Sequence, residues 1–424
     1  MFMTSAVSLL VSTFCLADAP DRPPKLTLDK PVDYIAWYDD FVRRGRTENA
    51  LDLYKGLYSD GDGQGGIQAL EGAAEAQYEK VKARIWEPKD YPELASYLEE
   101  CEPFLKIATK AVERKDFWQP ATPRPERLLD VKLPILSATR HASKALLARS
   151  WMRQDDRAAA MIDAYRVTLR MADHMQQGGV QIGGLVGLAE RGLVYDNVLA
   201  ALSTNVIQGK DIAAAYETLR RYDPKSPDWE RMITFEWAMV LDTLQYVKHH
   251  GSFDILGMEM SVSSPPDPAQ TLRFIDEYYA TLVSLPGKWA FTARNTQRIG
   301  RYCGQQKKRI RNDPFLAKMG LAATRAHQLL VRGETRRRGT LLTLAILEHH
   351  HKQGKWPKSL DDLKRKSVKQ IRTDPFSGAD FIYRLAGDQP VLYSVGSDGK
   401  DDGARHNAKW DGGGDYVFWP YPGR

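Results

Sequence analysis

The fold is decided by residues 132–177, which read KLPILSATRHASKALLARSWMRQDDRAAAMIDAYRVTLRMADHMQQ. In the first half, apolar residues recur at the spacing of about 3.6 residues that is typical of an amphipathic helix. The markers are Leu133, Leu136, Ala142, Leu146 and Trp151. The polar run Gln154-Asp155-Asp156 is typical of a tight turn, and a second helical pattern follows it to about Gln177. The stretch therefore predicts a helical hairpin.

Further helical segments are predicted on the C-terminal side of this hairpin, separated by Gly- and Pro-rich breaks. They cover residues 181–203, 209–222, 228–249, 268–284 and 314–332. No strict repeat period is visible, so no named repeat family is assigned. Residues 30–335 are therefore predicted to form a mainly α domain of stacked antiparallel helical hairpins, similar to a solenoid.

The composition is that of an ordinary globular chain. Of its 424 residues, 43% are hydrophobic and 27% are charged, and 60 Lys and Arg against 54 Asp and Glu give a net charge of +6. This balance excludes a disordered tail and a collagen-like fibre. No stretch has the roughly 18 consecutive apolar residues of a membrane helix, which excludes a polytopic membrane protein.

The N-terminus resembles an export signal. An apolar run at residues 6–16 precedes Ala17-Asp18-Ala19, which fits the small-residue pattern of a signal-peptidase site. Residues 1–19 are therefore predicted to be a signal peptide, and the chain to be exported to the periplasm or cell envelope. The alternative is a frayed or packed N-terminal segment. Cys101 and Cys303 would remain, either as a bridge or as two small buried residues.

The composition changes near residue 336, and residues 336–424 are predicted to form a small α+β module. A helix at 340–350 is followed by a short helix through Leu363. Three short β-like runs then follow. They are Phe381-Ile382-Tyr383, Val391-Leu392-Tyr393-Ser394-Val395 and Tyr416-Val417-Phe418.

Five short pieces of sequence in this module occur in a recognisable order. They are Gly354-Lys355-Trp356-Pro357-Lys358-Ser359-Leu360-Asp361-Asp362-Leu363, Asp374-Pro375-Phe376, Tyr383, Tyr393-Ser394-Val395-Gly396-Ser397-Asp398-Gly399 and Gly414-Asp415-Tyr416-Val417. In this order they make residues 340–419 resemble the C-terminal domain of the G-type major pseudopilin of type II secretion systems. The leader and the long apolar helix of that family have no counterpart here, so the module is not expected to polymerise as a pilin does.

The resemblance implies a calcium site in the loop between the last two strands. The matching positions are the Asp398 and Asp415 carboxylates and the Val395 carbonyl, with Asp411 in place of a family aspartate that is Gly414 here. Calcium prefers such oxygen ligands. Asp401 and Asp402 are competing ligands, and the alternative is a solvated Asp/Gly turn.

A second candidate calcium loop lies at residues 60–71, which fit the twelve-residue EF-hand pattern. Asp60, Asp62, Gln64, the Gly66 carbonyl and Glu71 take ligand positions. Gln64 departs from the pattern, because Asp, Asn or Ser is usual there. The alternative is a flexible Gly-rich link between two helices.

Residues 301–340 hold eleven Lys and Arg against two acidic residues. Two clusters stand out, and they are Lys307, Lys308, Arg309 and Arg311, and Arg336, Arg337 and Arg338. They indicate contact with an anionic surface, the alternative being a solvated face. No specific nucleic-acid partner is expected for an exported chain.

The sequence favours a non-catalytic scaffold protein of the envelope or of secretion, with other envelope proteins as partners. One alternative is a hydrolase that uses paired carboxylates on the helical domain. Its candidates are Glu190, Glu236 and Asp242, although nothing selects them. A further alternative is a calcium-responsive regulator that uses the EF-hand-like loop.

Overall fold

The hairpin region of residues 132–177 contains two neighbouring helices, α5 (Ile135–Ser150) and α6 (Arg157–Gln177). The structure is a computed structural model, and it describes residues 22–58, 65–152, 155–223, 228–254, 261–286, 291–319 and 323–423. These residues are mainly helical, as the sequence predicts, with a small antiparallel sheet near the C-terminus. Within them, no helix combines the length and the apolar character that crossing a membrane requires.

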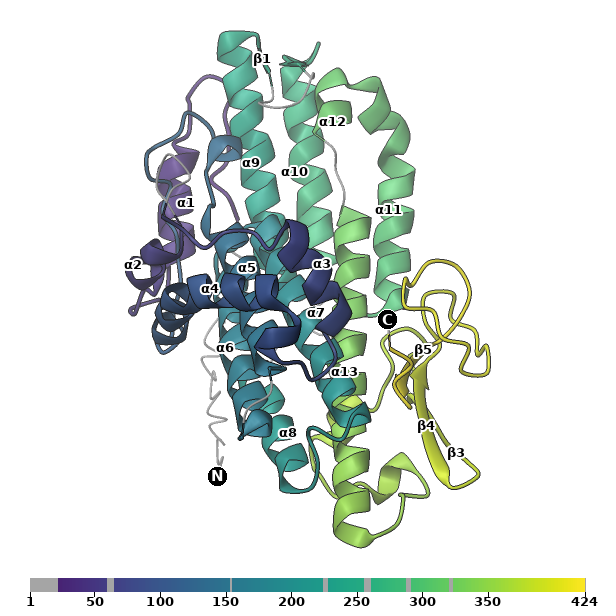
Figure 1. Cartoon of the computed structure of the whole chain (residues 1–424). Coiled ribbons are helices and arrows are strands. Elements are labelled where there is room, and N and C mark those ends of the chain that lie inside the picture. The colour runs from purple at the N-terminus through teal and green to yellow at the C-terminus, as the bar shows by residue number, and fades with distance from the viewer. Residues whose placement is uncertain are drawn as a thin grey trace, which may run out of the picture.

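Most of the long helices run side by side with roughly parallel axes and form a bundle (Figure 1). The short or peripheral ones are α1 (Tyr34–Arg43), α2 (Leu51–Tyr54), η1 (Lys55–Leu57), α3 (Gly72–Val81), η2 (Pro88–Asp90), η3 (Leu128–Asp130) and α12 (Pro314–Lys318). The other long ones are α4 (Pro92–Ala111), α7 (Gln181–Ser203), α8 (Lys210–Tyr222), α9 (Trp229–His250), α10 (Pro268–Ser284), α11 (Ala293–Asn312) and α13 (Ala323–Gln353).

Three features of the helical region differ from the prediction. The helix predicted at 314–332 is divided, because α12 ends at Lys318 and α13 begins at Ala323. Helix α11 is absent from the prediction, since it buries little besides Asn295 and Ile299 and so carries a weak apolar pattern. A short hairpin of β1 (Ser252–Asp254) and β2 (Ser261–Ser263) was also not predicted.

The buried residues form two clusters. One combines α2 to α8 with the middle of α13 and the C-terminal strands. The other combines α1, α9, α10, α11 and α12 with the start of α13. Leu330 belongs to the second cluster and Leu342 to the first, so α13 takes part in both. The predicted domain boundary at residues 335 and 336 lies inside α13, which continues through it without a break.

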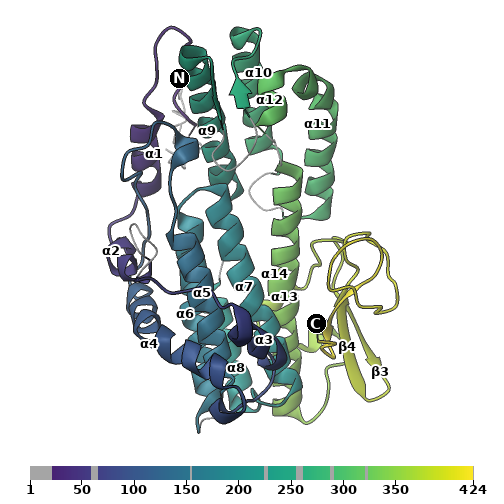
Figure 2. The same cartoon turned by 45° about the horizontal axis from the view of Figure 1, so that its top comes forward.

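Residues 354–423, here called the head, lie beside the C-terminal half of α13 (Figures 1 and 2). The head contains η4 (Leu360–Asp362), α14 (Val368–Ile371) and the antiparallel sheet β3-β4-β5, formed by β3 (Ile382–Ala386), β4 (Gln389–Ser394) and β5 (Tyr416–Trp419). The predicted short helix and strands are therefore present. A close approach fixes the sheet on α13, because a Cβ atom at Gly339 would lie 2.3 Å from Cζ of Phe418.

The cysteines that the structure describes are free thiols. Cys101 is buried in α4, and Cys303 is half-buried in α11, where its sulfur lies 3.3 Å from the Tyr278 hydroxyl. The predicted signal segment at residues 1–19, including Cys15, lies outside the described residues.

Candidate functional site

The acidic loop of the head, residues 395–415, connects β4 to β5. Its N-terminal end is held by Asp374, whose Oδ2 atom accepts hydrogen bonds from the Ser394 hydroxyl at 2.9 Å and from the Val395 N–H at 3.2 Å. Burial raises the pKa of Asp374, and these donors oppose the rise. The Asp-Pro-Phe turn therefore fixes the point where the loop leaves the sheet, and it leaves Val395 buried there.

Asp415 holds the other end of the loop. Its side chain is buried, and its carboxylate accepts hydrogen bonds from the N–H of Ala404 at 2.7 Å and of Asp402 at 3.3 Å. Burial raises the pKa of Asp415, and the negative charges of Asp401 and Asp402 raise it further. The loop thus brings several carboxylates close enough to repel one another.

Asp398 and Asp402 approach each other beside Gly413. A Cβ atom at Gly413 would lie 3.3 Å from Oδ2 of Asp398 and 3.8 Å from Oδ2 of Asp402. Oδ2 of Asp402 also accepts the Gly414 N–H at 2.8 Å. The loop therefore brings Asp398, Asp402 and Asp415 into one region, which Arg405 shares, since it pairs with Asp402 at 3.2 Å.

Asp411 lies on an exposed turn of the same loop. Its carbonyl accepts a hydrogen bond from the Asn407 side chain at 2.9 Å, and its charge acts on Arg332. No hydrogen bond joins Asp411 to Asp398 or Asp415 among the described residues. The resemblance offers Asp411 as a substitute for the aspartate that is Gly414 here, and the side chains of Asp411 and Asp398 are both exposed.

The oxygen atoms of this loop are of the chemical type that calcium binds, but their arrangement fits a calcium site only in part. Carboxylate and carbonyl oxygens are the ligands that calcium prefers. Within the described ranges, however, no three His, Cys, Asp or Glu side chains form a group that could hold a metal ion. Both oxygens of Asp415 are engaged by backbone N–H groups. A calcium ion would therefore require the carboxylates of Asp398 and Asp402 to turn toward Asp415.

The EF-hand-like loop is described only from Gly65 onward, and Asp60, Asp62 and Gln64 lie outside the described residues. The Gly66 carbonyl accepts a hydrogen bond from the Gln68 side chain at 2.8 Å. Glu71 is exposed and directly precedes α3, without a hydrogen bond from its side chain to the helix N-terminus. The helix predicted to follow the loop is therefore present.

Glu190, one of the three hydrolase candidates, is completely buried on α7. Within the described chain, neither of its carboxylate oxygens has a hydrogen-bond partner at normal distance. Burial raises the pKa of Glu190 to about 8, against smaller opposing effects of Thr139, Arg140 and Arg191. Such a group is neutral at pH 7 and has no access to a substrate.

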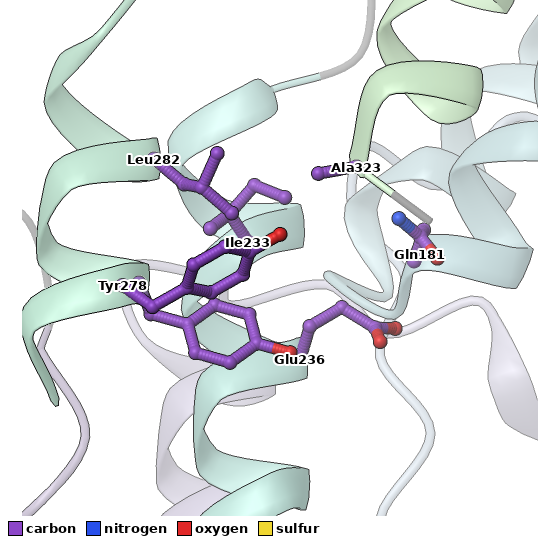
Figure 3. A pocket seen from close by; sticks show the side chains of 7 residues that line it. Gln181, Ile233, Glu236, Tyr278, Leu282 and Ala323 are labelled. Atoms are coloured by element: carbon purple, nitrogen blue, oxygen red, sulfur yellow. The ribbon is translucent and has the colours of Figure 1, made fainter. Parts of the chain in front are cut away.

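Glu236 and Asp242 occupy different surroundings on α9. Glu236 extends toward Gln181 at the edge of a cavity of about 10 Å³, which is about the space of one water molecule (Figure 3). Burial raises its pKa to about 7. Asp242 accepts the Leu128 N–H at 2.7 Å and a Gln245 amide hydrogen at 2.9 Å. Asp242 is thus engaged in internal hydrogen bonds, and the cavity beside Glu236 has no room for a substrate.

The two basic clusters differ in exposure. Lys307, Lys308, Arg309 and Arg311 are exposed on α11. Arg336, in contrast, forms an ion pair with Asp196 at 2.5 Å. Arg337 and Arg338 both pair with Glu334, at 2.9 and 2.6 Å. The cluster on α13 therefore neutralises internal carboxylates, and the exposed basic surface is the one on α11.

The chain matches no protein-family model, no curated protein and no solved structure. The resemblance of residues 340–419 to the pseudopilin domain therefore depends on the short motifs and their order.

Proposed function

We propose that the chain is a non-catalytic scaffold protein of the cell envelope, in which a body of stacked helical hairpins carries a pseudopilin-like head. The observation that carries the proposal is the junction, because the strands of the head and the middle of α13 share one buried cluster. A head fixed in this way presents its acidic loop at a set position on the body. It is not free to pack as a separate subunit.

Polar contacts support the same junction. The Tyr216 hydroxyl of α8 lies 2.6 Å from the Ser367 hydroxyl of the head. Arg365 of the head pairs with Glu348 of α13 and with Glu217 of α8, each at 2.5 Å. Three elements are thus joined by one arginine, which is the arrangement expected where relative motion is restricted.

We infer that calcium, where it binds, acts on the structure of the head rather than in a reaction. The carboxylates of Asp398, Asp402 and Asp415 lie in one loop, and the raised pKa of Asp415 reflects its burial together with neighbouring negative charge. A divalent cation would relieve this repulsion and would stabilise the folded loop by mass action. The same reasoning applies to residues 60–71 only if that loop binds the ion.

Thermal unfolding of the full chain with calcium or with a chelator tests this proposal. Calcium at about 100 times its dissociation constant adds about 2.7 kcal/mol to the free energy of unfolding, so the melting temperature should rise. Asp398→Ala should remove that rise, whereas Asp388→Ala, an exposed aspartate in the β3–β4 turn, should retain it. Glu71→Gln shows which of the two loops causes the rise in melting temperature, because it removes a candidate calcium ligand from the EF-hand-like loop alone.

A melting temperature that is the same with calcium and with chelator would remove the metal from the proposal and leave the scaffold. Location is tested separately, by fractionating cells and sequencing the N-terminus of the mature chain. Recovery outside the cytoplasm with residues 1–19 removed supports the envelope assignment. A cytoplasmic chain that retains them contradicts it.

Helix α11 suggests what the body contacts. It carries seven Lys and Arg and no acidic residue over twenty residues. Like charges at i,i+4 spacing destabilise a helix, and here no acid on the same helix offsets them. We therefore propose that α11 lies against an anionic membrane surface, with lipid headgroups as its counter-charge.

A further inference from the structure

A cavity of about 490 Å³ lies between the helical body and the head. Its walls come from α7, from α13, from loop residues 406–410, and from the C-terminal residues after β5. The size falls within the range of about 300–1,000 Å³ that is typical of small-molecule sites. This junction cavity exists only because the head is fixed on the body, so the proposal below goes beyond the scaffold function.

Two glycines allow the helices to form this wall. A Cβ atom at Gly333 on α13 would lie 2.1 Å from Leu188 on α7, so the helices approach closely there. A Cβ atom at Gly192 on α7 would lie 2.4 Å from Nη1 of Arg336, whose guanidinium crosses this point. Arg336 also donates to the Gly192 carbonyl at 2.7 Å. The wall therefore holds an arginine side chain in a fixed position.

The fixed charges of the described cavity lining are all positive. Arg332, Arg336 and Lys409 line it, and none of the described residues in the lining is acidic. Arg336 is compensated by Asp196 outside the lining. Arg332 donates to the Trp410 carbonyl at 2.6 Å, and within the described chain it forms no direct ion pair, although the negative charge of Asp411 acts on it from outside the lining. Burial and the positive charge of Arg325 lower the pKa of Arg332, and the negative charge of Asp411 opposes them to a smaller extent, so the cation is only partly compensated.

The rest of the lining is mainly apolar. Leu185 and Leu188 of α7 and Leu329 of α13 lie on the helix side. His406 lines the loop side, and its Nδ1 atom accepts the Val417 N–H at 3.1 Å, so its proton is on Nε2 when the ring is neutral. The cavity thus combines apolar side chains from α7 and α13 with cationic donors from α13 and the loop and a neutral donor, His406.

We propose that the junction cavity binds a small amphiphilic anion, an acidic group on an apolar body. The acidic group would be held by Arg332 and Lys409, and the apolar body would lie against the leucines of α7 and α13. A charged group of this kind would form the direct ion pair that Arg332 does not have within the described chain, and charge-assisted hydrogen bonds to a guanidinium are strong. Because the lining belongs to both parts, the ligand would also hold the head on the body.

Calorimetric titration of the full chain with three probes tests this proposal. Phenyl phosphate carries both halves of the ligand, inorganic phosphate carries the charge alone, and phenol carries the ring alone. The expected result is saturable binding of phenyl phosphate that is at least tenfold tighter than that of either half, about 1.4 kcal/mol. Equal binding of phenyl phosphate and inorganic phosphate, or no saturable binding of phenyl phosphate, would overturn the proposal.

Substitutions locate the site. Arg332→Gln should weaken phenyl phosphate binding about tenfold, the loss of one charge-assisted interaction. Arg298→Gln, an exposed arginine on α11, is the matched control and should leave it unchanged. Lys409 is exposed, so Lys409→Gln should weaken phenyl phosphate binding about threefold without affecting folding. This variant tests the site if Arg332→Gln does not fold. A folded Arg332→Gln or a Lys409→Gln with undiminished affinity would contradict the assignment.

Discussion

Helices α11 and α13 lie side by side, and each carries a basic cluster, but the clusters have different surroundings. On α11 the cations are exposed, and the ion pair that involves them, Arg309 with Glu277, has a separation of 3.8 Å. On α13 each arginine of the cluster meets a carboxylate within 2.9 Å. The density of positive charge is alike in the two sequences, so the difference comes from where the acidic partners lie.

The acidic partners of the α13 arginines come from the same helix and from a distant part of the chain. Glu334 is one turn away from Arg337 and Arg338, whereas Asp196 reaches Arg336 from α7. Although burial opposes it, the two neighbouring guanidinium groups lower the pKa of Glu334 to about 2. Positive charge on α13 therefore stabilises the interior, and positive charge on α11 is available to a partner.

The largest effect is expected for Glu334→Gln. Removing one partner from a buried ion pair costs about 3–5 kcal/mol, and here two arginines lose their carboxylate. The folded pKa of Glu334 lies below that of the unfolded chain, so its contribution is present above about pH 4.5 and is lost as the pH falls toward 2. Urea unfolding at pH 7 and pH 3 should show the loss shrinking at the lower pH.

Glu99→Gln provides the control for that experiment. Glu99 is exposed on α4, so its replacement should change the free energy of unfolding by no more than about 0.5 kcal/mol. Equal destabilisation by both variants, or a loss for Glu334→Gln that is the same at pH 7 and pH 3, would contradict the contrast between the two helices.

Gly339→Ala and Gly304→Ala compare the packing of the two helices. On α13 the added methyl group would meet the Phe418 ring at 2.3 Å, so overpacking should cost about 1–3 kcal/mol. On α11 nothing lies within 4 Å of the new atom, so Gly304→Ala should stabilise the helix by about 0.5–1 kcal/mol. Hydrogen exchange in β5 should increase in Gly339→Ala alone. Opposite signs for the two variants would show that the head is fixed on α13.

Glu190→Gln asks what a buried carboxylate does without an arginine partner. The folded pKa of Glu190, about 8, lies above the unfolded value, so the folded chain holds its proton and loses stability as the pH rises from about 4.5 to 8. The variant should be about 1–2 kcal/mol more stable than the wild type at pH 8. A difference of one pKa unit corresponds to about 1.4 kcal/mol, and the buried glutamine amide retains part of the free-energy cost of burying a polar group. The gain should disappear near pH 5. A pH-independent difference would mean that Glu190 does not ionise in this range.

The sequence predicts those helices well that have both an apolar face and a clear break at each end. Helix α7 starts shortly after Gly178-Gly179, and helix α10 starts at Pro268, as these residues indicate. Helix α13 has no Pro and no positive-φ Gly near residue 336, and it therefore continues through a change in composition that suggested a domain boundary. Helix α11 is held by few buried residues, and its cationic sequence hides it.

The sites show the same limit. The motifs placed Asp398 and Asp415 in one loop, because the ends of neighbouring strands are close whatever the loop does between them. They do not predict that Asp402 and Arg405 pair within the loop, since this depends on the backbone of the loop. The junction cavity cannot be predicted from sequence motifs. Arg332 binds the Trp410 carbonyl 78 positions away, and helix α7 forms another wall of the cavity. Only the packing of the head on the body brings these residues together.

The smallest effect on stability is expected for the triple variant Lys307→Gln, Lys308→Gln, Arg311→Gln. These side chains are exposed, so the free energy of unfolding should change by no more than about 0.5 kcal/mol. Binding to vesicles that contain phosphatidylglycerol should nevertheless weaken by about 3 kcal/mol, at about 1 kcal/mol for each cation near the surface, and neutral phosphatidylcholine vesicles should bind neither protein. The triple variant Lys364→Gln, Lys366→Gln, Lys369→Gln removes the same charge from exposed positions on the head. If the two variants lose vesicle binding equally, the attraction comes from net charge and α11 has no particular part in it. If only the α11 variant loses it, the exposed cations of that helix are the contact.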